Sequence, residues 1–326
     1  MDLSGKRLVV FGAGYVGAEV ARQAVARGLR VTALTRNADT ARALADVGVE
    51  TVVADLAGND WHGRVAGGAD FVLNSVGSGG GGLAGYRRSY VDGMRSALAW
   101  AARGGVTAGG ILVYTSSTSV YSQDGGVTVD ETAATGGSER ADILVEAENL
   151  ALRAAAETGA ATPSSRSEKR DEGVAAPARA LGGVHRAFVL RLAGIYGPGR
   201  HHLLDQLRAG ATELPGRGDH RLNLAHRDDI CAALWAALAA PPTVAGGVFN
   251  VADDGAATKA EVVAWLAAQL GVAVPRFTGE PAASARRAVT PDRVIANGKI
   301  RHVLGWRPGF PTFREGYAEI LRAGGG

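Results

Sequence analysis

The chain has 326 residues, of which 46% are apolar and 21% charged, a composition that excludes wholesale disorder and is typical of a soluble globular protein. Its net charge is only +3 and its basic residues are spread along the sequence, so we expect no nucleic-acid partner. There is no apolar run of membrane-spanning length, no signal-peptide pattern, and a single cysteine, Cys231, which cannot form an internal disulfide. We therefore expect a cytoplasmic protein, a monomer or homodimer, with no membrane partner and no bound metal.

The first half of the sequence alternates short apolar segments with amphipathic ones. This pattern predicts an α/β fold, a Rossmann-type doubly wound parallel sheet covered by helices on both faces. The expected strands are Leu8–Phe11, Arg30–Leu34, Thr51–Val53, Asp70–Leu73, Ile111–Tyr114 and Ala187–Leu192. The expected helices are 15–27, 38–47, 84–103 and 138–158.

After about residue 195 prolines punctuate the sequence and the pattern loosens. We expect a sheet domain over 1–194, with 227–253 returning to the sheet, and a smaller C-terminal lobe over most of 195–326. The expected elements in this half are helices at 228–239, 258–270, 297–304 and 312–322 and a strand at Val248–Val251. Residues 162–183 are polar and lack an apolar period, which favours a flexible surface insertion.

A glycine pattern follows the first strand directly. Gly12-Ala13-Gly14-Tyr15-Val16-Gly17 is a G-x-G-x-x-G motif that opens the first helix. In this context Gly12 permits a tight turn, Gly14 lets a pyrophosphate approach the backbone, and Gly17 lets helix and strand pack closely. Tyr15 and Val16 begin the helix, whose N-terminus favours phosphate. We therefore predict a dinucleotide cofactor.

The end of the second strand indicates which dinucleotide. An NAD site places an acidic residue about twenty residues beyond the motif. This chain has Thr35 and Arg36 there, and a permanently charged guanidinium suits a 2′-phosphate, so NADP is favoured over NAD. A solvent-exposed loop role for Arg36 is the alternative. Further cofactor candidates are Asp55 and Leu56 (toward the adenine, with an N-cap role for Asp55 as the alternative), Ser75, Thr115 and Ser116.

A second glycine run, Gly77–Gly82 with Ser78 inside it, follows the fourth strand. It has two interpretations. One is a surface connection with no function, and the other is backbone that must approach a ligand closely.

With these features the sequence resembles the extended and atypical short-chain dehydrogenases, the NAD-dependent epimerase/dehydratase-like proteins. The matching segments are Gly12–Gly17, Asp55–Leu56, Tyr90–Gly93, Val113–Tyr121, Leu190–Arg200, Asn223 with His226, Asp228 and Asp229, Phe249–Val251 and Leu304–Pro308. The resemblance implies that Ser117 polarises a substrate carbonyl or alcohol. It also implies a tyrosine as general acid/base, with a lysine four residues later that lowers its pKa.

That pair is missing from the sequence. No lysine occurs between residues 7 and 168, and none of the four lysines has a tyrosine four residues before it. With Glu148 taken as the acidic residue that usually follows the pair in that family, the resemblance places the pair at Arg140 and Leu144. We expect alanine at either position to leave turnover nearly unchanged, since neither side chain transfers protons at neutral pH. Phe11 also stands where extended members carry a first glycine. Both departures point to the atypical branch.

Proton transfer must then come from another group. The catalytic candidates beside Ser117 are Tyr196, expected at the carboxyl edge of the sheet, and His226, expected at the start of a helix; Tyr121 and Glu146 are further possibilities. Arg200, Asn223 and Tyr121 are candidate substrate contacts, each with a packing role as the alternative. Two functions stay open: an NADP-dependent oxidoreductase or epimerase/dehydratase-like enzyme acting on a small hydroxy or carbonyl compound, and a dinucleotide-binding sensor with little redox turnover.

Overall fold

The computed structural model describes residues 3–160, 183–280 and 290–323. Its central feature is a seven-stranded sheet in the order β11-β7-β5-β4-β1-β2-β3, so the predicted Rossmann-type α/β fold is confirmed. The pairs that join β3, β2, β1, β4 and β5 are all parallel. The strands are β1 (Arg7–Phe11), β2 (Arg30–Thr35), β3 (Glu50–Val53), β4 (Ala69–Asn74), β5 (Val106–Ser117), β7 (Arg186–Leu192) and β11 (Gly247–Val251).

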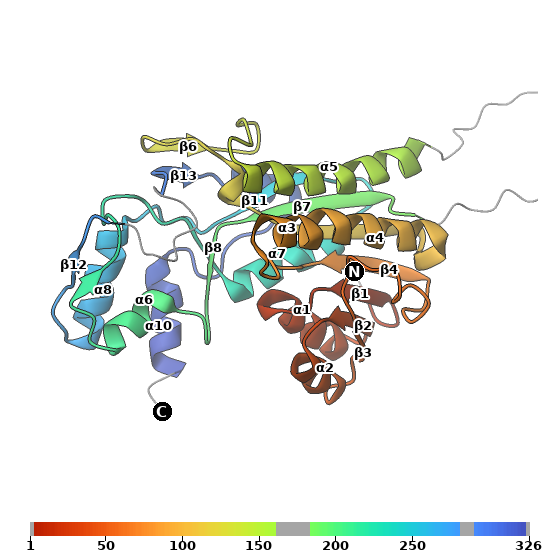
Figure 1. Ribbon diagram of the computed structural model, residues 1–326, viewed down its shortest axis with the longest axis horizontal. Coiled ribbons are helices and arrows are strands. Elements are labelled where there is room, and N and C mark those ends of the chain that lie inside the picture. Colours follow the sequence, from red (N-terminus) through yellow and green to blue (C-terminus); the bar gives the residue numbers. More distant parts are fainter. Residues whose placement is uncertain (1–2, 161–182, 281–289, 324–326) are drawn as a thin grey trace, which may run out of the picture. The chain divides into compact units, whose positions relative to one another are not determined.

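Helices connect these strands as the apolar periodicity predicts. Helices α3 and α4 both pack against α5 along the sheet (Figure 1), whereas α1 and α2 pack together against β1, β2 and β3. The predicted helix at 84–103 is observed as successive α-helical and π-helical segments, and the helical backbone ends before Arg103 and Gly104, whose φ and ψ are not helical. The elements are α1 (Tyr15–Ala26), α2 (Ala38–Ala45), α3 (Gly82–Arg87), the π-helix η1 (Arg88–Asp92), α4 (Gly93–Trp100), the π-helix η2 (Ala101–Gly105) and α5 (Glu139–Ala160).

The chain divides into two compact units that interleave along the sequence. The first unit comprises Met1–Ser116, Ser138–Leu190 and Ala237–Val248. The second comprises Ser117–Gly137, Arg191–Ala236 and Phe249–Gly326. The expected insertion at 162–183 lies, apart from Gly183, outside the described residues. Among the described residues no helix is both long and apolar enough to cross a membrane.

The core of the first unit forms beneath the carboxyl end of β1. This strand is apolar throughout Leu8–Phe11, and all four side chains are fully buried. Phe11 stacks against two tryptophans, with ring centroids 4.9 Å from Trp61 and 5.5 Å from Trp100. Aromatic packing of this kind adds to the free energy of burial. The rigid end of β1 therefore fixes the turn at Gly12, which starts one residue later.

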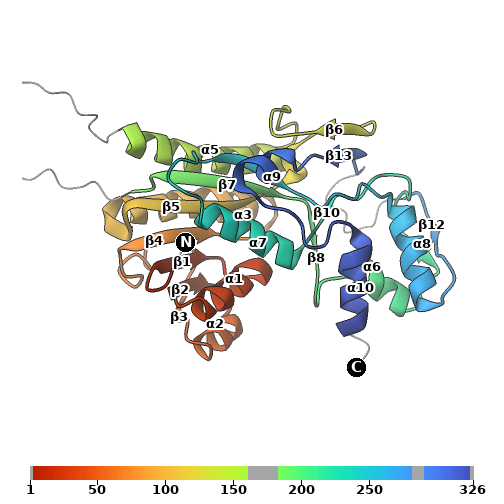
Figure 2. The ribbon, with the colours of Figure 1, turned by 180° about the vertical axis from the view of Figure 1, so that it is seen from behind.

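The second unit contains helices and short parallel strand pairs (Figure 2). The pairs join β8 with β10, β9 with β12, and β6 with β13. The strands are β6 (Val127–Val129), β8 (Gly194–Tyr196), β9 (Glu213–Leu214), β10 (Leu224–His226), β12 (Arg276–Phe277) and β13 (Arg293–Ile295). The helices are the 3-10 turn η3 (Thr118–Val120), α6 (His202–Arg208), α7 (Arg227–Leu238), α8 (Lys259–Leu270), α9 (Gly298–Leu304) and α10 (Phe313–Ala323).

Two placements made from the sequence are wrong. Strand β7 ends at Leu192, so Tyr196 does not lie at the edge of the central sheet but ends the separate strand β8. His226 ends β10 and does not begin a helix, because α7 starts at Arg227. Sequence analysis missed β8 and β10 altogether, since strands of three residues are too short to show a period of two.

Candidate functional site

The glycine motif forms a tight turn between β1 and α1. Gly12 has φ +85°, and a Cβ there would lie 2.6 Å from the backbone of Val76. At Gly17 a Cβ would overlap the carbonyl oxygen of Gly12. Gly14 is different: no atom lies within 4 Å of the position its Cβ would take, which is open space. Two glycines therefore serve chain packing, and the third keeps a cradle open for a ligand.

Helix α1 presents its N-terminus at this cradle. Gly14 is its N-cap residue and supplies no side-chain cap, and no acidic residue lies in the first turn. The partial positive charge of the helix end is therefore not neutralised by a neighbouring carboxylate. Tyr15 and Val16 form that first turn, and the Val16 side chain is buried. Helix termini with these properties favour phosphate groups, so the geometry fits the predicted phosphate site.

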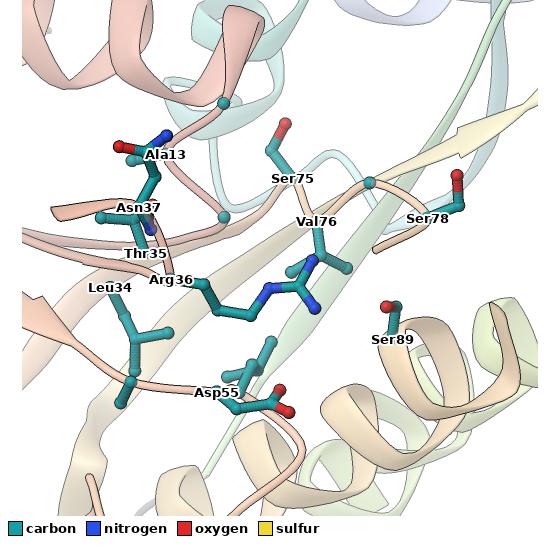
Figure 3. A pocket seen from close by; sticks show the side chains of 15 residues that line it. Ala13, Leu34, Thr35, Arg36, Asn37, Asp55, Ser75, Val76, Ser78 and Ser89 are labelled. Carbon is teal, nitrogen blue, oxygen red and sulfur yellow. Dashed lines mark hydrogen bonds between the residues drawn. The ribbon is translucent and has the colours of Figure 1, made fainter. Parts of the chain in front are cut away.

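A pocket of about 250 Å³ opens beside the cradle (Figure 3). It lies where β1, β2, β3 and β4 end, and β1 and β4 flank the point at which the strand order of the sheet reverses. Doubly wound sheets bind ligands at this switch point. The lining residues are Gly12, Ala13, Gly14, Leu34, Thr35, Arg36, Asn37, Ala54, Asp55, Leu56, Ser75, Val76, Gly77, Ser78 and Ser89.

Arg36 crosses this pocket above Asp55, with its guanidinium toward Ser89 (Figure 3). The residue is exposed, and none of the ion pairs or hydrogen bonds found among the described residues involves its side chain. Beneath it, the Thr35 hydroxyl is buried and accepts a hydrogen bond from the Asn37 amide at 3.2 Å. An exposed cation that forms no ion pair or hydrogen bond among the described residues therefore lines the pocket, close enough to the Asp55 carboxylate to lower its pKa.

Asp55 is already committed to protein contacts. Its Oδ1 accepts a hydrogen bond from the Ala57 amide at 3.1 Å, and its Oδ2 accepts one from Arg88 at 3.0 Å. Partial burial alone would raise the pKa of Asp55, but the Ala57 amide, Arg88 and Arg36 together lower it. Leu56 is buried and forms the pocket floor beside it. The structure thus shows a turn-capping role for Asp55, and the adenine contact stays a prediction.

Three hydroxyl candidates lie at the ends of β4 and β5. Ser75 lines the pocket, and its Oγ is 3.4 Å from that of Thr115, which is buried. Ser116 donates a 2.5 Å hydrogen bond to the buried Glu148 of α5. Of the three, only Ser75 reaches the pocket, and the contact with Glu148 commits Ser116 to the packing of β5 against α5.

Sequence analysis missed several pocket residues. Asn37 caps α2 by accepting a hydrogen bond from the Thr40 amide, and its exposed side lines the pocket. Ser78 and Ser89 complete the wall opposite Arg36. In the sequence, the one signal for Ser89 is its position directly before the Tyr90–Gly93 segment. In the structure Ser89 lies in the π-helix η1, and π turns gather at functional sites.

The places of the missing acid/base pair are occupied by packing residues in the first unit. The Arg140 guanidinium lies 5.3 Å from the centroid of the Tyr86 ring. The expectation that alanine at either position leaves turnover nearly unchanged stays a prediction; Leu144 is 1% exposed, so its alanine variant should lose about 2–5 kcal/mol of stability. Glu146 forms ion pairs with Arg87 and Arg95.

In the second unit, Ser117 is the N-cap of η3. Its Oγ accepts a hydrogen bond from the Ser119 amide at 3.1 Å, and the residue is partly exposed. A hydroxyl that accepts one bond still has its own proton to donate. This geometry is compatible with polarising an oxygen of a substrate, a role that stays a prediction.

The three substrate candidates differ in their surroundings. The Tyr121 hydroxyl donates to Asn250 at 2.8 Å and accepts from Arg191 at 2.9 Å, inside the core. Asn223 bridges strand β13 by donating to the carbonyl of Arg293 and accepting from the amide of Ile295. Arg200 is exposed and ends a turn. Tyr121 and Asn223 therefore hold the second unit together.

Tyr196 and His226 are brought together as cross-strand partners of β8 and β10, with ring centroids 5.2 Å apart. Both are buried, and among the described residues neither the Tyr196 hydroxyl nor His226 Nε2 has a hydrogen-bond partner. Burial raises the pKa of Tyr196 far above its usual range and lowers that of His226. Tyr196 is thus a poor proton donor at neutral pH, and His226 is neutral there.

Comparison with known proteins bears on the pocket. Residues 12–150 match the profile of a family described as NAD(P)H-binding. A relative from Streptomyces sp, 3-diazoavenalumate denitrifying reductase, is 34% identical over 167 residues, which are 45% of this chain and 53% of that protein. The chain thus matches about half the length of this curated relative.

Solved structures match almost the whole chain. A conserved protein of unknown function from Silicibacter pomeroyi has a TM-score of 0.69 at 24% identity, covering 98% of this chain and 99% of that one. MoeE5 in complex with UDP-glucuronic acid and NAD has a TM-score of 0.75 at 22% identity, covering 98% of this chain and 99% of that one. DesIV, a dTDP-glucose 4,6-dehydratase from Streptomyces venezuelae with NAD bound, has a TM-score of 0.75 at 22% identity, covering 97% of this chain and 96% of that one. At these identities the likeness shows the fold.

The fold, the cradle and the pocket define an NAD(P)-binding protein of the Rossmann type. Residues 12–150 match the NAD(P)H-binding family, and the fold matches solved structures that include a dTDP-glucose 4,6-dehydratase and a UDP-glucuronic acid 4-epimerase.

Proposed function

We propose that this chain is an NADPH-dependent oxidoreductase that reduces a small molecule. The observation that carries the proposal is the exposed guanidinium of Arg36, which forms no ion pair or hydrogen bond among the described residues, beside an open phosphate cradle. Gly12, Gly14 and the N-terminus of α1 would hold the pyrophosphate, and Arg36 would pair with the 2′-phosphate of the adenosine. The cofactor would supply a hydride.

The chemistry must proceed without a Tyr-Lys pair, which the sequence does not contain. For a hydroxy or carbonyl substrate, Ser117 would donate a hydrogen bond to the reacting oxygen, and a solvent-derived proton or another acid would complete the step. Tyr196 is not our choice for this acid, because its hydroxyl is buried against α10 and burial raises its pKa. His226 is neutral and equally buried.

A reaction that protonates no oxygen would make the missing pair irrelevant. The name of the Streptomyces relative describes a denitrifying reductase of a diazo compound. When a hydride reduces a diazonium-bearing carbon, a C–H bond forms, the C–N bond breaks, and dinitrogen leaves with the bonding electron pair. We therefore include diazo and diazonium compounds beside carbonyl compounds as candidate substrates.

The proposal is tested by following oxidation of NADPH and of NADH by the purified chain, with a panel of carbonyl, diazo and diazonium compounds. We expect substrate-dependent oxidation with a preference for NADPH. The matched control is Gly14→Val, which introduces a side chain into open space and should block the cradle without a clash in the protein. An absence of oxidation across the panel, with cofactor binding intact, would favour the dinucleotide-binding sensor instead.

A further inference from the structure

The glycine run after β4 contains a position that fits Arg36. A Cβ placed on Gly79 would overlap both terminal nitrogens of the Arg36 guanidinium and lie only 2.6 Å from its Cζ. These three atoms are the nearest neighbours of that position. The guanidinium is therefore seated directly on the backbone of Gly79, in a place that a side chain would take.

The backbone at Gly79 is held in place from the other side. Its amide donates a hydrogen bond to the Ser89 hydroxyl at 3.2 Å, which ties the loop to η1. Its φ does not lie in the left-handed region, so any residue type suits its conformation. A side chain at position 79 would thus conflict with the present place of the Arg36 guanidinium and not with the turn.

We propose that Gly79 is a specificity-determining position, because its bare backbone sets Arg36 across the pocket where a 2′-phosphate would bind. This inference rests on the proposed NADPH preference. A larger residue at position 79 must displace the guanidinium, since the loop is tied to Ser89 whereas Arg36 is flexible and exposed. The protein would keep its fold and its pyrophosphate cradle but lose discrimination between NADP and NAD.

The same loop supplies a matched control. Gly77 also lines the pocket and also lacks a positive φ, but no atom lies within 4 Å of the position of its Cβ. Gly77→Ala therefore adds the same methyl group two residues away without touching Arg36. Any general effect of stiffening the glycine run appears in both variants, and only displacement of Arg36 is specific to Gly79→Ala.

The experiment measures calorimetric binding of NADPH, NADH, adenosine 2′,5′-bisphosphate and 5′-AMP to the full chain and its variants. Arg36→Ala should lower the affinity for the two 2′-phosphorylated ligands about 10- to 100-fold, as expected for loss of a charge-assisted hydrogen bond. Gly79→Ala should lower it about 3- to 10-fold, with NADH and 5′-AMP unchanged. Gly77→Ala, whose methyl group also faces the pocket, should change the binding of phosphorylated and unphosphorylated ligands alike and leave their affinity ratio as in the wild type. In the Arg36→Ala background, Gly79→Ala should have no further effect.

The outcomes separate the two proposals. If the wild type binds both classes of ligand equally, the NADPH preference fails and the role of Gly79 falls with it. If the wild type discriminates and Arg36→Ala abolishes this, but Gly79→Ala and Gly77→Ala behave alike, only the inference about Gly79 is overturned. Equal melting temperatures of the two glycine variants exclude a folding defect as the cause of weaker binding.

Discussion

Helix α10 touches Tyr196 at a glycine, and this contact gives a sharp prediction. A Cβ on Gly316 would overlap the Tyr196 hydroxyl and lie 2.7 Å from Cζ and 2.8 Å from Cε2 of the ring. The ring cannot move aside easily, because it is 3% exposed and packs 5.0 Å from Tyr317 and 5.2 Å from His226, centroid to centroid. We therefore expect Gly316→Ala to overpack the core of the second unit.

The size of the effect follows from two opposing terms. Alanine within a helix stabilises by about 1 kcal/mol over glycine, and overpacking costs about 1–3 kcal/mol. Because the new Cβ would overlap the Tyr196 hydroxyl, we take the upper part of the overpacking range, about 2–3 kcal/mol. The free energy of unfolding then falls by about 1–2 kcal/mol, which lowers the melting temperature by about 2–8 °C in a chain of this size. Tyr196→Phe alone should be neutral or stabilising, because it removes a buried hydroxyl that has no hydrogen-bond partner among the described residues.

Thermal unfolding followed by circular dichroism measures the stability of the wild type, of Gly316→Ala, of Tyr196→Phe and of the double variant. The double variant should recover at least half of the loss, since phenylalanine removes the atom nearest to the new methyl group. Gly298→Ala, at the start of α9 with open space around its Cβ position, is the control. A Gly316→Ala protein as stable as the wild type would refute the packing argument. A loss of turnover in Tyr196→Phe with unchanged stability would reinstate Tyr196 as a catalytic group.

Three further predictions concern charge and catalysis. Arg36→Asp should weaken NADPH binding strongly and NADH binding little, because an anion replaces a cation beside the 2′-phosphate; equal losses in a calorimetric titration would contradict this. Burial raises the pKa of Asp253 to about 8, so the folded protein loses stability as the pH rises from about 4 through 8, by up to about 1.4 kcal/mol per pH unit. Asp253→Asn should flatten the pH dependence of the free energy of unfolding in urea over this window, and an unchanged slope would disprove the assignment. Ser117→Ala should raise the activation free energy for a carbonyl substrate by about 2–4 kcal/mol, and so lower turnover, with little change in cofactor affinity. Full activity would exclude a role of Ser117 in polarising the substrate.

The sheet and its cradle could be predicted because their signals are local. The buried strand before Gly12, the spacing of Gly14 and Gly17, and the cation at Arg36 are each visible within a few residues of sequence. The geometry then follows from generic rules of βα units, in which the loops after parallel strands meet at one edge.

The second unit could not be predicted in the same way. The two- and three-residue strands of its sheets have no period, and their partners are distant: Tyr196 pairs with His226, thirty positions later. Side chains that look functional in sequence, such as Tyr121 and Asn223, turn out to bridge segments of this unit. A polar residue in a motif signals a specific hydrogen bond, and only the fold shows whether the partner is protein or ligand.

The contrast between an open cradle and the missing acid/base pair has a physical consequence for the reaction. At the place of the lysine, Leu144 lies in the packed core between α5 and its neighbours, and an ammonium at that depth would be destabilising without a partner. At the place of the tyrosine, the Arg140 guanidinium rests on the Tyr86 ring of α3. Both positions therefore contribute to the packing of the first unit, and neither presents a group that exchanges protons at neutral pH. If the pocket holds NADPH as proposed, a chain that uses these positions for packing is suited to substrates whose reduction needs little help from an acid. Such substrates expel a neutral leaving group or develop charge that a single Ser117 hydrogen bond can stabilise.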